Sequence, residues 1–262
     1  FQGPNQTIIS ACASANDALG YSLRLLRAGD ADIVISGGTE ASVSPLPMAG
    51  FANMKALTQE NDIPSEASRP FDLDRKGFVM GEGAGILVLE TEDHAIKRNA
   101  NILAELSGYG ATDDAYHVTQ PIEGGTGAVN AMKLAVEDAR FNLTEINYIN
   151  AHGTSTYYND KNETAAIRTL FSSHAKSLKV SSTKSMTGHL LGASGAIEAI
   201  ACIKAIETNR IPPTINYTTP DPECNLDYVP NHSESLFITG ILSNSFGFGG
   251  HNAVIAFRPW KK

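Results

Sequence analysis

Three segments of this sequence each join a run typical of a β-strand to a turn of small residues and then to a run typical of a helix. They are SACASANDALG around Cys12, NAHGTST around His152 and STKSMTGHLLGASG around His189. A strand-to-helix turn can present a reactive side chain, because free backbone amides and open space meet there. The sequence therefore predicts one thiol and two imidazoles at the ends of strands.

The rest of the chain predicts an α/β fold, since apolar runs of strand type and helix type alternate along it. Strands are expected at residues 6–12, 31–38, 83–90, 102–111, 146–153, 178–183, 241–247 and 251–257, and helices at 14–30, 91–99, 125–139, 162–174 and 192–209. Such an alternation favours a parallel or mixed sheet covered by helices. Residues 42–76, rich in Pro, Asn, Ser and Asp, are expected to form a long loop region.

Two stretches of the chain resemble each other weakly. Residues 7–29 and 178–209 both run from a strand through a small-residue turn into a helix rich in Ala and Leu. This similarity suggests a duplicated architecture with two halves.

Charge and composition exclude several classes of function. The net charge of −8 argues against nonspecific nucleic-acid binding, which needs clustered basic residues. No apolar run reaches the roughly 18 residues of a membrane span, so no membrane association is expected. The first residue is Phe1 rather than Met, so the chain is expected to be a fragment or to lack its beginning.

The three cysteines are too few and too irregularly spaced for a disulfide framework or a zinc site. Cys202 lies in the apolar helical pattern AIEAIACIKAI and is expected to pack in the core. Cys224 lies in the loop DPECNLD and is interpreted as incidental. Free thiols indicate a reducing, cytoplasmic setting.

Cys12 is the candidate nucleophile. It ends an apolar run and precedes Ala, Ser and Ala, so it is expected near a helix N-terminus, where the helix dipole stabilises a thiolate. The alternative is an inert buried cysteine, which is the commonest environment of this residue. The small neighbours favour the nucleophile, because they leave space for a substrate.

The two histidine segments offer groups for proton transfer or oxyanion binding. Thr154 and Thr156 follow His152 and can hold a ring or a ligand by hydrogen bonds. Lys184 precedes His189 and can tune its protonation or pair with Glu198. Both histidines could instead be structural, satisfied by backbone groups.

The segment SNSFGFGGHN contains Phe246 and Phe248 among three glycines. Its backbone amides could bind an oxyanion and its ring could gate an apolar pocket, or it could be a flexible turn between two strands. The other histidines have less distinctive settings: His94 and His174 are expected on helix surfaces, His117 at the mouth of a site, and His251 in a structural role.

Taken together, these segments resemble the β-ketoacyl-acyl carrier protein synthases, and most closely their elongating type II enzymes. The similarity runs through ACASANDALG, SRPFDLDRKGFVMGEGAG, NAHGTST, SSTKSMTGHLLGASGAIE, IPPTIN and NSFGFGG. It implies the thiolase fold, with duplicated βαβαβ units in α-β-α-β-α layers and usually in a homodimer. Residues 1–100 would be the remainder of the N-terminal half, which carries the nucleophile, and residues 101–262 the C-terminal half with both histidines.

The resemblance also implies roles for individual residues. Cys12 matches the acylated nucleophile, His152 and His189 the two catalytic histidines, and Phe248 the gating phenylalanine. Lys184 matches the lysine beside the histidines, with Glu198 as its ion partner. Further matches are Phe51 in the acyl pocket, Thr154 and Thr156 near the pantetheine arm, and Lys55 as a basic contact for the acidic carrier protein.

The implied reaction is a decarboxylative condensation that needs an acyl carrier protein but no metal or organic cofactor. A ketosynthase domain of a polyketide synthase and an inactive fragment with a structural role are the alternatives. A degradative thiolase would need a second cysteine near the glycine loop, and an initiating condensing enzyme would have Asn in place of His189. A cysteine protease has a different nucleophile segment, and a silent partner subunit would lack Cys12.

Two departures from the family pattern are visible. Tyr157 stands where the family commonly has proline after HGTST, which is expected to alter a surface turn. Family members also carry a long segment before the nucleophile that supplies core strands and dimer contacts. Residues 1–262 alone are therefore expected to be poorly stable or inactive.

Overall fold

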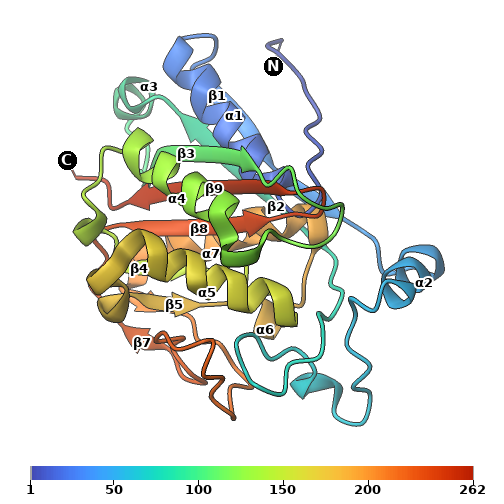
Figure 1. The fold of residues 1–262 in the computed structure, drawn as a ribbon. Helices are drawn as coiled ribbons and strands as arrows, with labels where there is room; N and C mark the ends of the chain where they lie inside the picture. Colours follow the sequence, from blue (N-terminus) through green and yellow to red (C-terminus); the bar gives the residue numbers. More distant parts are fainter. Residues whose placement is uncertain (1, 262) are drawn as a thin grey trace.

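A computed structural model describes residues 2–261 and shows a five-stranded mixed sheet at the centre of the molecule (Figure 1). The strands lie in the order β3 (Glu105–Asp113), β9 (His251–Arg258), β8 (Ile241–Phe246), β4 (Tyr148–Asn150) and β5 (Lys179–Ser181). β4 runs parallel to β5 and β8, whereas β9 is antiparallel to β8 and β3. The expected mixed sheet is confirmed.

Helices cover both faces of this sheet. α4 (Thr126–Asp138) and α5 (Tyr157–Phe171) pack on one face, and α1 (Ser14–Ala28) and α7 (Ser194–Thr208) on the other. The alternation along β9 shows this directly: Val254 belongs to the core beneath α4 and α5, and Ile255 to the core beneath α1 and α7. β9 contains a continuous apolar run at residues 253–257, because both of its faces are buried there.

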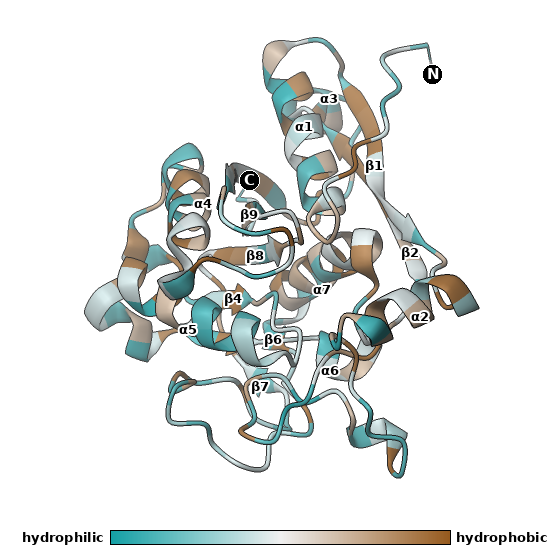
Figure 2. Cartoon of the chain, turned by 45° about the vertical axis from the view of Figure 1, so that its right-hand side comes forward, coloured by the Kyte–Doolittle hydropathy of each residue, from teal (hydrophilic) through white to brown (hydrophobic). Residues whose placement is uncertain are grey.

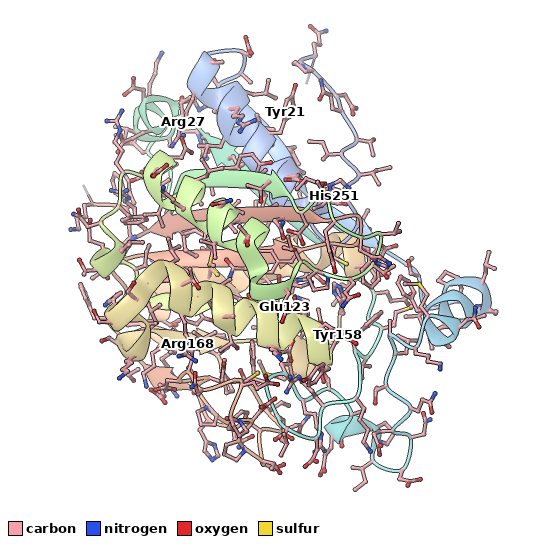
Figure 3. All side chains as sticks on the ribbon, viewed as in Figure 1. Tyr21, Arg27, Glu123, Tyr158, Arg168 and His251 are labelled. Carbon is pink, nitrogen blue, oxygen red and sulfur yellow. The ribbon has the colours of Figure 1, made fainter. Side chains whose placement is uncertain are left out.

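The outer surface of the α4 and α5 layer is polar. On α5, Ile167 and Phe171 face the core, whereas Arg168 is exposed. Figure 3 shows Arg168 and Glu123 on this outer side. The spacing of apolar residues thus places α5 on the sheet as an amphipathic helix.

A second, smaller sheet lies on the far side of α1 and α7. It consists of β1 (Ile33–Glu40) and β2 (Gly83–Glu90), paired antiparallel. Leu87 of β2 faces inward and is buried, but Ile35, Ile86 and Val88 are 54%, 58% and 61% exposed. Figure 2 shows the hydrophobic colour along β1. Residues 31–38 were expected as a buried strand, and the outward face of β1 corrects that expectation.

Two further expectations were wrong. Residues 6–12 form no strand, because they make only an isolated bridge between Ser10 and Cys12, and most of residues 2–9 are exposed. The region 42–76, expected as loop, contains α2 (Pro45–Asn53) and a short 3₁₀ turn, η1 (Pro64–Glu66). Pro45 begins α2 at a position where its missing N–H costs nothing.

The other expected elements are present, and α5 begins at Tyr157 rather than at residue 162. The remaining elements are α3 (Glu92–Lys97), α6 (Lys184–Thr187), β6 (Arg210–Ile211), β7 (Glu234–Ser235), η2 (Glu123–Gly125), η3 (Leu143–Glu145), η4 (Ser172–Ser177) and η5 (Leu191–Ala193). Over residues 2–261, none of the helices combines the length and the apolar character that a membrane crossing requires.

Candidate active site

Cys12 lies in the tight turn that leads into α1. Ala11 adopts a left-handed φ of 51°, and the cysteine side chain is 6% exposed. Gly247 of the β8–β9 loop packs against this turn: a Cβ added there would lie 3.1 Å from the Cys12 nitrogen and 2.9 Å from the Ser10 oxygen. Only glycine permits this approach, so the loop and the nucleophile are placed together.

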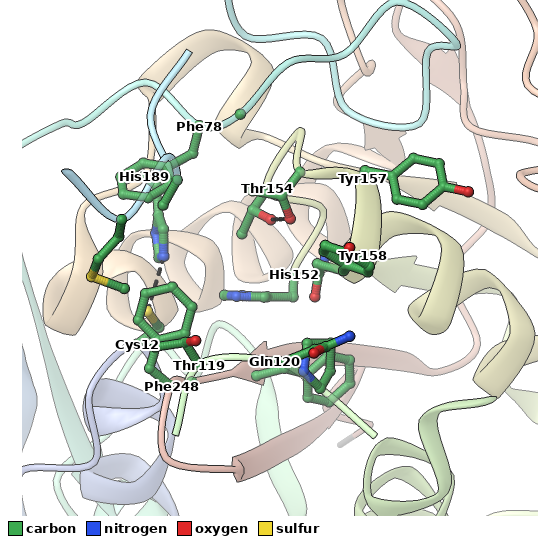
Figure 4. A pocket seen from close by; sticks show the side chains of 18 of the residues that line it. Cys12, Phe78, Thr119, Gln120, His152, Thr154, Tyr157, Tyr158, His189 and Phe248 are labelled. Atoms are coloured by element: carbon green, nitrogen blue, oxygen red, sulfur yellow. Dashed lines mark hydrogen bonds between the residues drawn. The ribbon is translucent and has the colours of Figure 1, made fainter. Parts of the chain in front are cut away.

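The fold brings Cys12, His152 and His189 into one cluster (Figure 4). His189 Nε2 lies 3.0 Å from Cys12 Sγ, and the rings of His152 and His189 are 5.3 Å apart and nearly perpendicular. The potential ligand atoms of all three residues lie within 4.8 Å of one another. The three segments that stood out in the sequence therefore converge on one point.

Ser194 orients the His189 ring. The Ser194 hydroxyl accepts the Leu190 backbone N–H at 2.9 Å and lies 2.8 Å from His189 Nδ1. The hydroxyl that accepts from Leu190 still has its own proton, and donating this proton to Nδ1 leaves the imidazole N–H at Nε2. His189 then presents a donor toward Cys12.

A buried glutamate holds the His152 segment in place. Glu163 on α5 accepts the backbone N–H groups of His152 and Gly153 at 2.9 and 2.8 Å, and the Asn244 amide at 3.0 Å. Burial raises the pKa of Glu163, and these hydrogen bonds oppose that rise. Sequence reasoning missed this residue, although an acidic side chain on the buried side of a helix was a signal.

Lys184 and Glu198 form a buried ion pair beside the histidines, as expected, with side chains 2% and 3% exposed. The pair lies in the second half of the chain, between α6 and α7. Burial raises the pKa of Glu198, and the Lys184 ammonium opposes this shift. The Lys184 ammonium of this pair lies close enough to the cluster to lower the pKa of both histidines.

Burial and this charge set the protonation of the cluster. Burial, and secondarily Lys184, lowers the pKa of His152 and of His189 well below 6.5, so both imidazoles are neutral at pH 7. Burial raises the pKa of Cys12 to about 11, opposed by Lys184 and by the backbone N–H groups of Phe248 and Cys12. The resting group is a thiol, which corrects the expectation of a thiolate stabilised by a helix N-terminus.

The β8–β9 loop supplies Phe248. Gly249 and Gly250 adopt φ angles of 87° and 88°, and the Gly249 N–H donates to the Val118 carbonyl at 2.7 Å. The Phe248 ring lies 6.3 Å from the Phe51 ring. The loop is therefore anchored at its backbone, while its aromatic side chain borders the cluster.

Phe78 is a second residue that sequence reasoning missed. Its ring lies edge-on to His189 at 5.2 Å and to Phe51 at 5.4 Å, and its side chain is 3% exposed. It packs the face of the His189 imidazole and joins it to the apolar side of the site. Its place inside the segment RKGFVMGEGAG was the available signal.

Two cavities meet at Cys12. One, of about 610 Å³, is bordered by Lys55, both histidines of the cluster, and the substrate-side candidates Thr154, Thr156 and Phe246. The other, of about 600 Å³, is bordered by Phe51 and by apolar residues such as Ile35 and Ile86. Cys12 and Phe248 border both. The same sulfur can thus be reached from the side of the two histidines and from the side of Phe51.

The remaining candidates lie around the cavity on the histidine side. Thr154 and Thr156 join their hydroxyls at 2.9 Å, and the Phe246 ring lies 5.9 Å from His152. His117 borders the same cavity, as expected. Tyr157 is half-exposed and donates to Glu223 at 3.0 Å.

Two cysteines and two histidines outside the cluster are either more buried than the sequence suggested or as buried as expected. Cys202 is fully buried, as expected, but Cys224 is also buried, in the core beneath α4 and α5, and is not an incidental loop residue. His94 contacts Glu90 at 2.7 Å, and the His174 ring lies 2.8 Å from the Ile146 carbonyl. Both histidines are partly buried, which corrects the expectation of surface groups.

Comparison with known families gives two matches. Residues 1–95 match the family described as beta-ketoacyl synthase, N-terminal domain, and residues 103–218 the family described as beta-ketoacyl synthase, C-terminal domain. Both matches follow the order of the motifs in the sequence.

Two curated relatives are 3-oxoacyl-[acyl-carrier-protein] synthase 2 of Synechocystis sp., 53% identical, and of Staphylococcus aureus strain COL, 51% identical. Each match covers 99% of this chain but only 62% and 63% of the relative. The chain thus spans less than two thirds of the length of these relatives.

Solved structures share the fold. A type II PKS ketosynthase in complex with its acyl-carrier protein and bound to the hexaketide superposes with a TM-score of 0.97 at 42% identity, covering 99% of this chain and 64% of that one. A beta-ketoacyl synthase from Burkholderia phymatum gives 0.91 at 41% identity, covering 96% and 60%. The expected thiolase-like α/β fold is confirmed.

Proposed function

Because this chain belongs to the beta-ketoacyl synthase family, we propose that it catalyses the decarboxylative Claisen condensation that lengthens a fatty acyl chain by two carbons. The observation that carries the proposal is the meeting of two cavities at Cys12, opposite two neutral imidazoles. One cavity suits an acyl tail and the other a second thioester.

The first step is acyl transfer to Cys12. The sulfur attacks the carbonyl of an acyl thioester on a carrier protein, the new C–S bond forms, and the carrier thiol leaves with the cysteine proton. The backbone N–H groups of Cys12 and Phe248 point toward the sulfur and would hold the oxyanion. Covalent capture divides one difficult step into two easier ones.

The second step generates the carbon nucleophile. Malonyl thioester loses carbon dioxide, and the electron pair of the broken C–C bond moves into an enolate. The N–H at His189 Nε2 and the neighbouring His152 would hydrogen-bond the enolate oxygen. Neutral imidazoles suit this role, because each carries one N–H that can be donated to the enolate oxygen.

The third step forms the product. The enolate carbon attacks the Cys12 thioester, a C–C bond forms, and the cysteine sulfur leaves and recovers a proton. The product is a β-ketoacyl thioester two carbons longer on the carrier. This scheme uses side chains, backbone amides and two thioesters, so it calls for no metal or organic cofactor.

An acyl carrier protein is the partner we propose. Support comes from the solved ketosynthase in complex with its acyl-carrier protein, and from Lys55, which is exposed beside the cavity on the histidine side, where an acidic carrier could dock. We also propose a homodimer and a cytoplasmic setting, the latter in keeping with three cysteines that are all free.

The test separates the condensation from the decarboxylation. Cys12→Ala should abolish condensation, and His152→Ala and His189→Ala should also suppress malonyl decarboxylation. Cys224→Ala, a buried cysteine far from the cluster, is the control and should retain both activities. Unchanged decarboxylation in both histidine variants would contradict the proposed role of the histidines. Condensation by the Cys12→Ala variant would contradict the role of Cys12 as nucleophile.

A polyketide ketosynthase is the second candidate, favoured by the 0.97 TM-score to a type II PKS ketosynthase. The same variants cannot distinguish the two, because the chemistry at Cys12 is shared. A competition between carrier proteins loaded with saturated acyl chains and carrier proteins loaded with polyketide chains would distinguish them. Preferential acylation of Cys12 by the saturated chain supports fatty acid elongation, and preferential acylation by the polyketide chain supports the polyketide role.

A further inference from the structure

The cluster of Cys12, His152 and His189 combines the donor atoms that zinc prefers. Within residues 2–261 it is the one group of three or more Cys, His, Asp or Glu side chains whose potential ligand atoms lie so close together. A thiolate sulfur with two imidazole nitrogens is a common zinc ligand set, and catalytic sites often use three protein ligands with an open fourth position. The sequence shows no metal-binding pattern here, because the three ligand residues are far apart and not regularly spaced.

The distances suit a tetrahedral ion with a small adjustment. Bonds of about 2.3 Å to sulfur and about 2.1 Å to nitrogen hold ligand atoms roughly 3.3–3.6 Å apart. His189 Nε2 and Cys12 Sγ are 3.0 Å apart, and the widest separation in the cluster is below 4.8 Å. Side-chain rotations that move each ligand atom by about an ångström would place all three atoms around one ion.

The surroundings resemble a prepared metal site in two further respects. Ser194 lies 2.8 Å from His189 Nδ1 and fixes the ring with Nε2 toward the sulfur. When the ring proton moves to Nδ1, the Ser194 hydroxyl can accept a hydrogen bond from it, as outer-shell partners of metal-bound histidines do, and Nε2 is free to bind the ion. His152 Nδ1 is buried and has no hydrogen-bond partner among the residues the structure describes. The adjoining cavity of about 610 Å³ on the histidine side also has room for a fourth ligand.

We propose that this cluster binds Zn²⁺ reversibly through Cys12 Sγ and one nitrogen each of His152 and His189, and that the bound ion blocks the nucleophile. Binding replaces the thiol proton by a metal–sulfur bond and releases one proton to solvent. The Lys184 ammonium borders the cluster and opposes a cation, and the Glu198 carboxylate paired with it offsets that charge. Zinc therefore acts as a dissociable inhibitor and not as a resident cofactor.

The first experiment replaces zinc by Co²⁺, whose bonds to thiolate absorb in the near ultraviolet. The parent protein should develop this absorption band on titration with Co²⁺, and the Cys202→Ala variant should develop it equally. Cys12→Ala should lose the band while its circular dichroism stays unchanged. Absence of the band in the parent protein, or its persistence in Cys12→Ala, overturns the proposal.

The second experiment needs no variant of the cluster and no turnover. Zn²⁺ should protect Cys12 from iodoacetamide, whereas Mg²⁺ at the same concentration should not, as read by mass spectrometry of the labelled peptide. Ser194→Ala should weaken this protection about tenfold, the lower end of the cost of losing an outer-shell partner. Equal labelling with both metals contradicts the proposal, whether or not the condensation itself is confirmed.

Discussion

The two regions of the molecule differ in how completely they enclose their own side chains. In the region before residue 100, the two-stranded sheet leaves Ile35, Ile86 and Val88 more than half exposed. In the region after it, a five-stranded sheet lies between helices, and Val254 and Ile255 in β9 are fully buried. Yet the nucleophile belongs to the first region and both histidines to the second.

The contacts of α1 indicate that Cys12 is positioned mainly by the second region, which follows residue 100. Asn16 on α1 donates to the carbonyls of Ser243 and Ala253 at 3.0 and 3.2 Å. A Cβ added at Gly195 on α7 would lie 2.4 Å from the Asn16 oxygen. Helix α1 is therefore fitted closely to β8, β9 and α7, and it carries Cys12 with it.

The largest expected effect comes from damage to the second region. Glu198→Ala leaves the Lys184 ammonium buried without its partner, and removing one member of a buried pair costs about 3–5 kcal/mol. We expect a matching loss in the free energy of unfolding by urea titration, and faster labelling of Cys12.

Glu207→Ala is the control on the same helix. Its pair with Lys204 is solvent-exposed, with side chains 29% and 64% exposed, and such pairs contribute about 0–1 kcal/mol. Equal costs for the two variants would show that the buried pair does not support the second region.

The second effect tests how well that region encloses the thiol. With a pKa raised to about 11, the thiolate fraction of Cys12 is still rising in mildly alkaline solution. Its iodoacetamide rate should climb about a hundredfold from pH 8 to pH 10, against about fourfold for an ordinary thiol with a pKa of about 8.5. Free cysteine labelled in parallel is the reference. A labelling rate of Cys12 that reaches a plateau below pH 9 would contradict the burial of the thiol.

The third effect concerns the junction of the two regions. Asn16→Ala leaves two buried carbonyls without their donor, which costs about 1–3 kcal/mol. Thermal unfolding should show the loss, and Cys12 labelling should become faster in the folded protein. Asn61→Ala, which removes an exposed hydrogen bond within a loop, should change neither; similar behaviour of the two variants would mean that Asn16 does not hold α1.

The smallest effect is expected on the open face of the small sheet. Val88 is 61% exposed, so Val88→Thr should change the free energy of unfolding by less than about 0.5 kcal/mol. Leu87→Ala, on the inward face and 8% exposed, should cost about 2–5 kcal/mol. A cost above about 2 kcal/mol for Val88→Thr would show that another surface covers this face in solution.

Much of the second region could be predicted from the sequence, because its periodic segments agree with their tertiary setting. The strand expected at 251–257 is continuous in apolar residues from residue 253 to residue 257, and this part is buried on both faces. In the first region, residues 6–12 have the composition of a strand, but a strand also needs a neighbour, and among residues 2–261 none pairs with them. Helix α2 was missed because its two prolines indicated a loop.

The reactive groups of the site could be predicted and their supports could not. Cys12, His152 and His189 stand out by their glycine-rich neighbours. The roles of Glu163, Ser194 and Phe78 depend on which way a side chain turns after the chain has folded, and local sequence does not encode that. The pKa of Cys12 was expected to fall, because the helix N-terminus was visible in the sequence and the depth of burial was not.

The hydrogen bond from Asn16 to Ser243 joins residues that are 227 positions apart. At a ribosome adding about 5–20 residues per second, the partner emerges roughly ten to fifty seconds after the asparagine. During that interval His152 and His189 are made, but Cys12 has no strand β8 or β9 to support it. The thiol becomes part of the assembled site only when translation has passed β9 at residue 258, so the nucleophile stays without this support while all the residues between α1 and β9 are made.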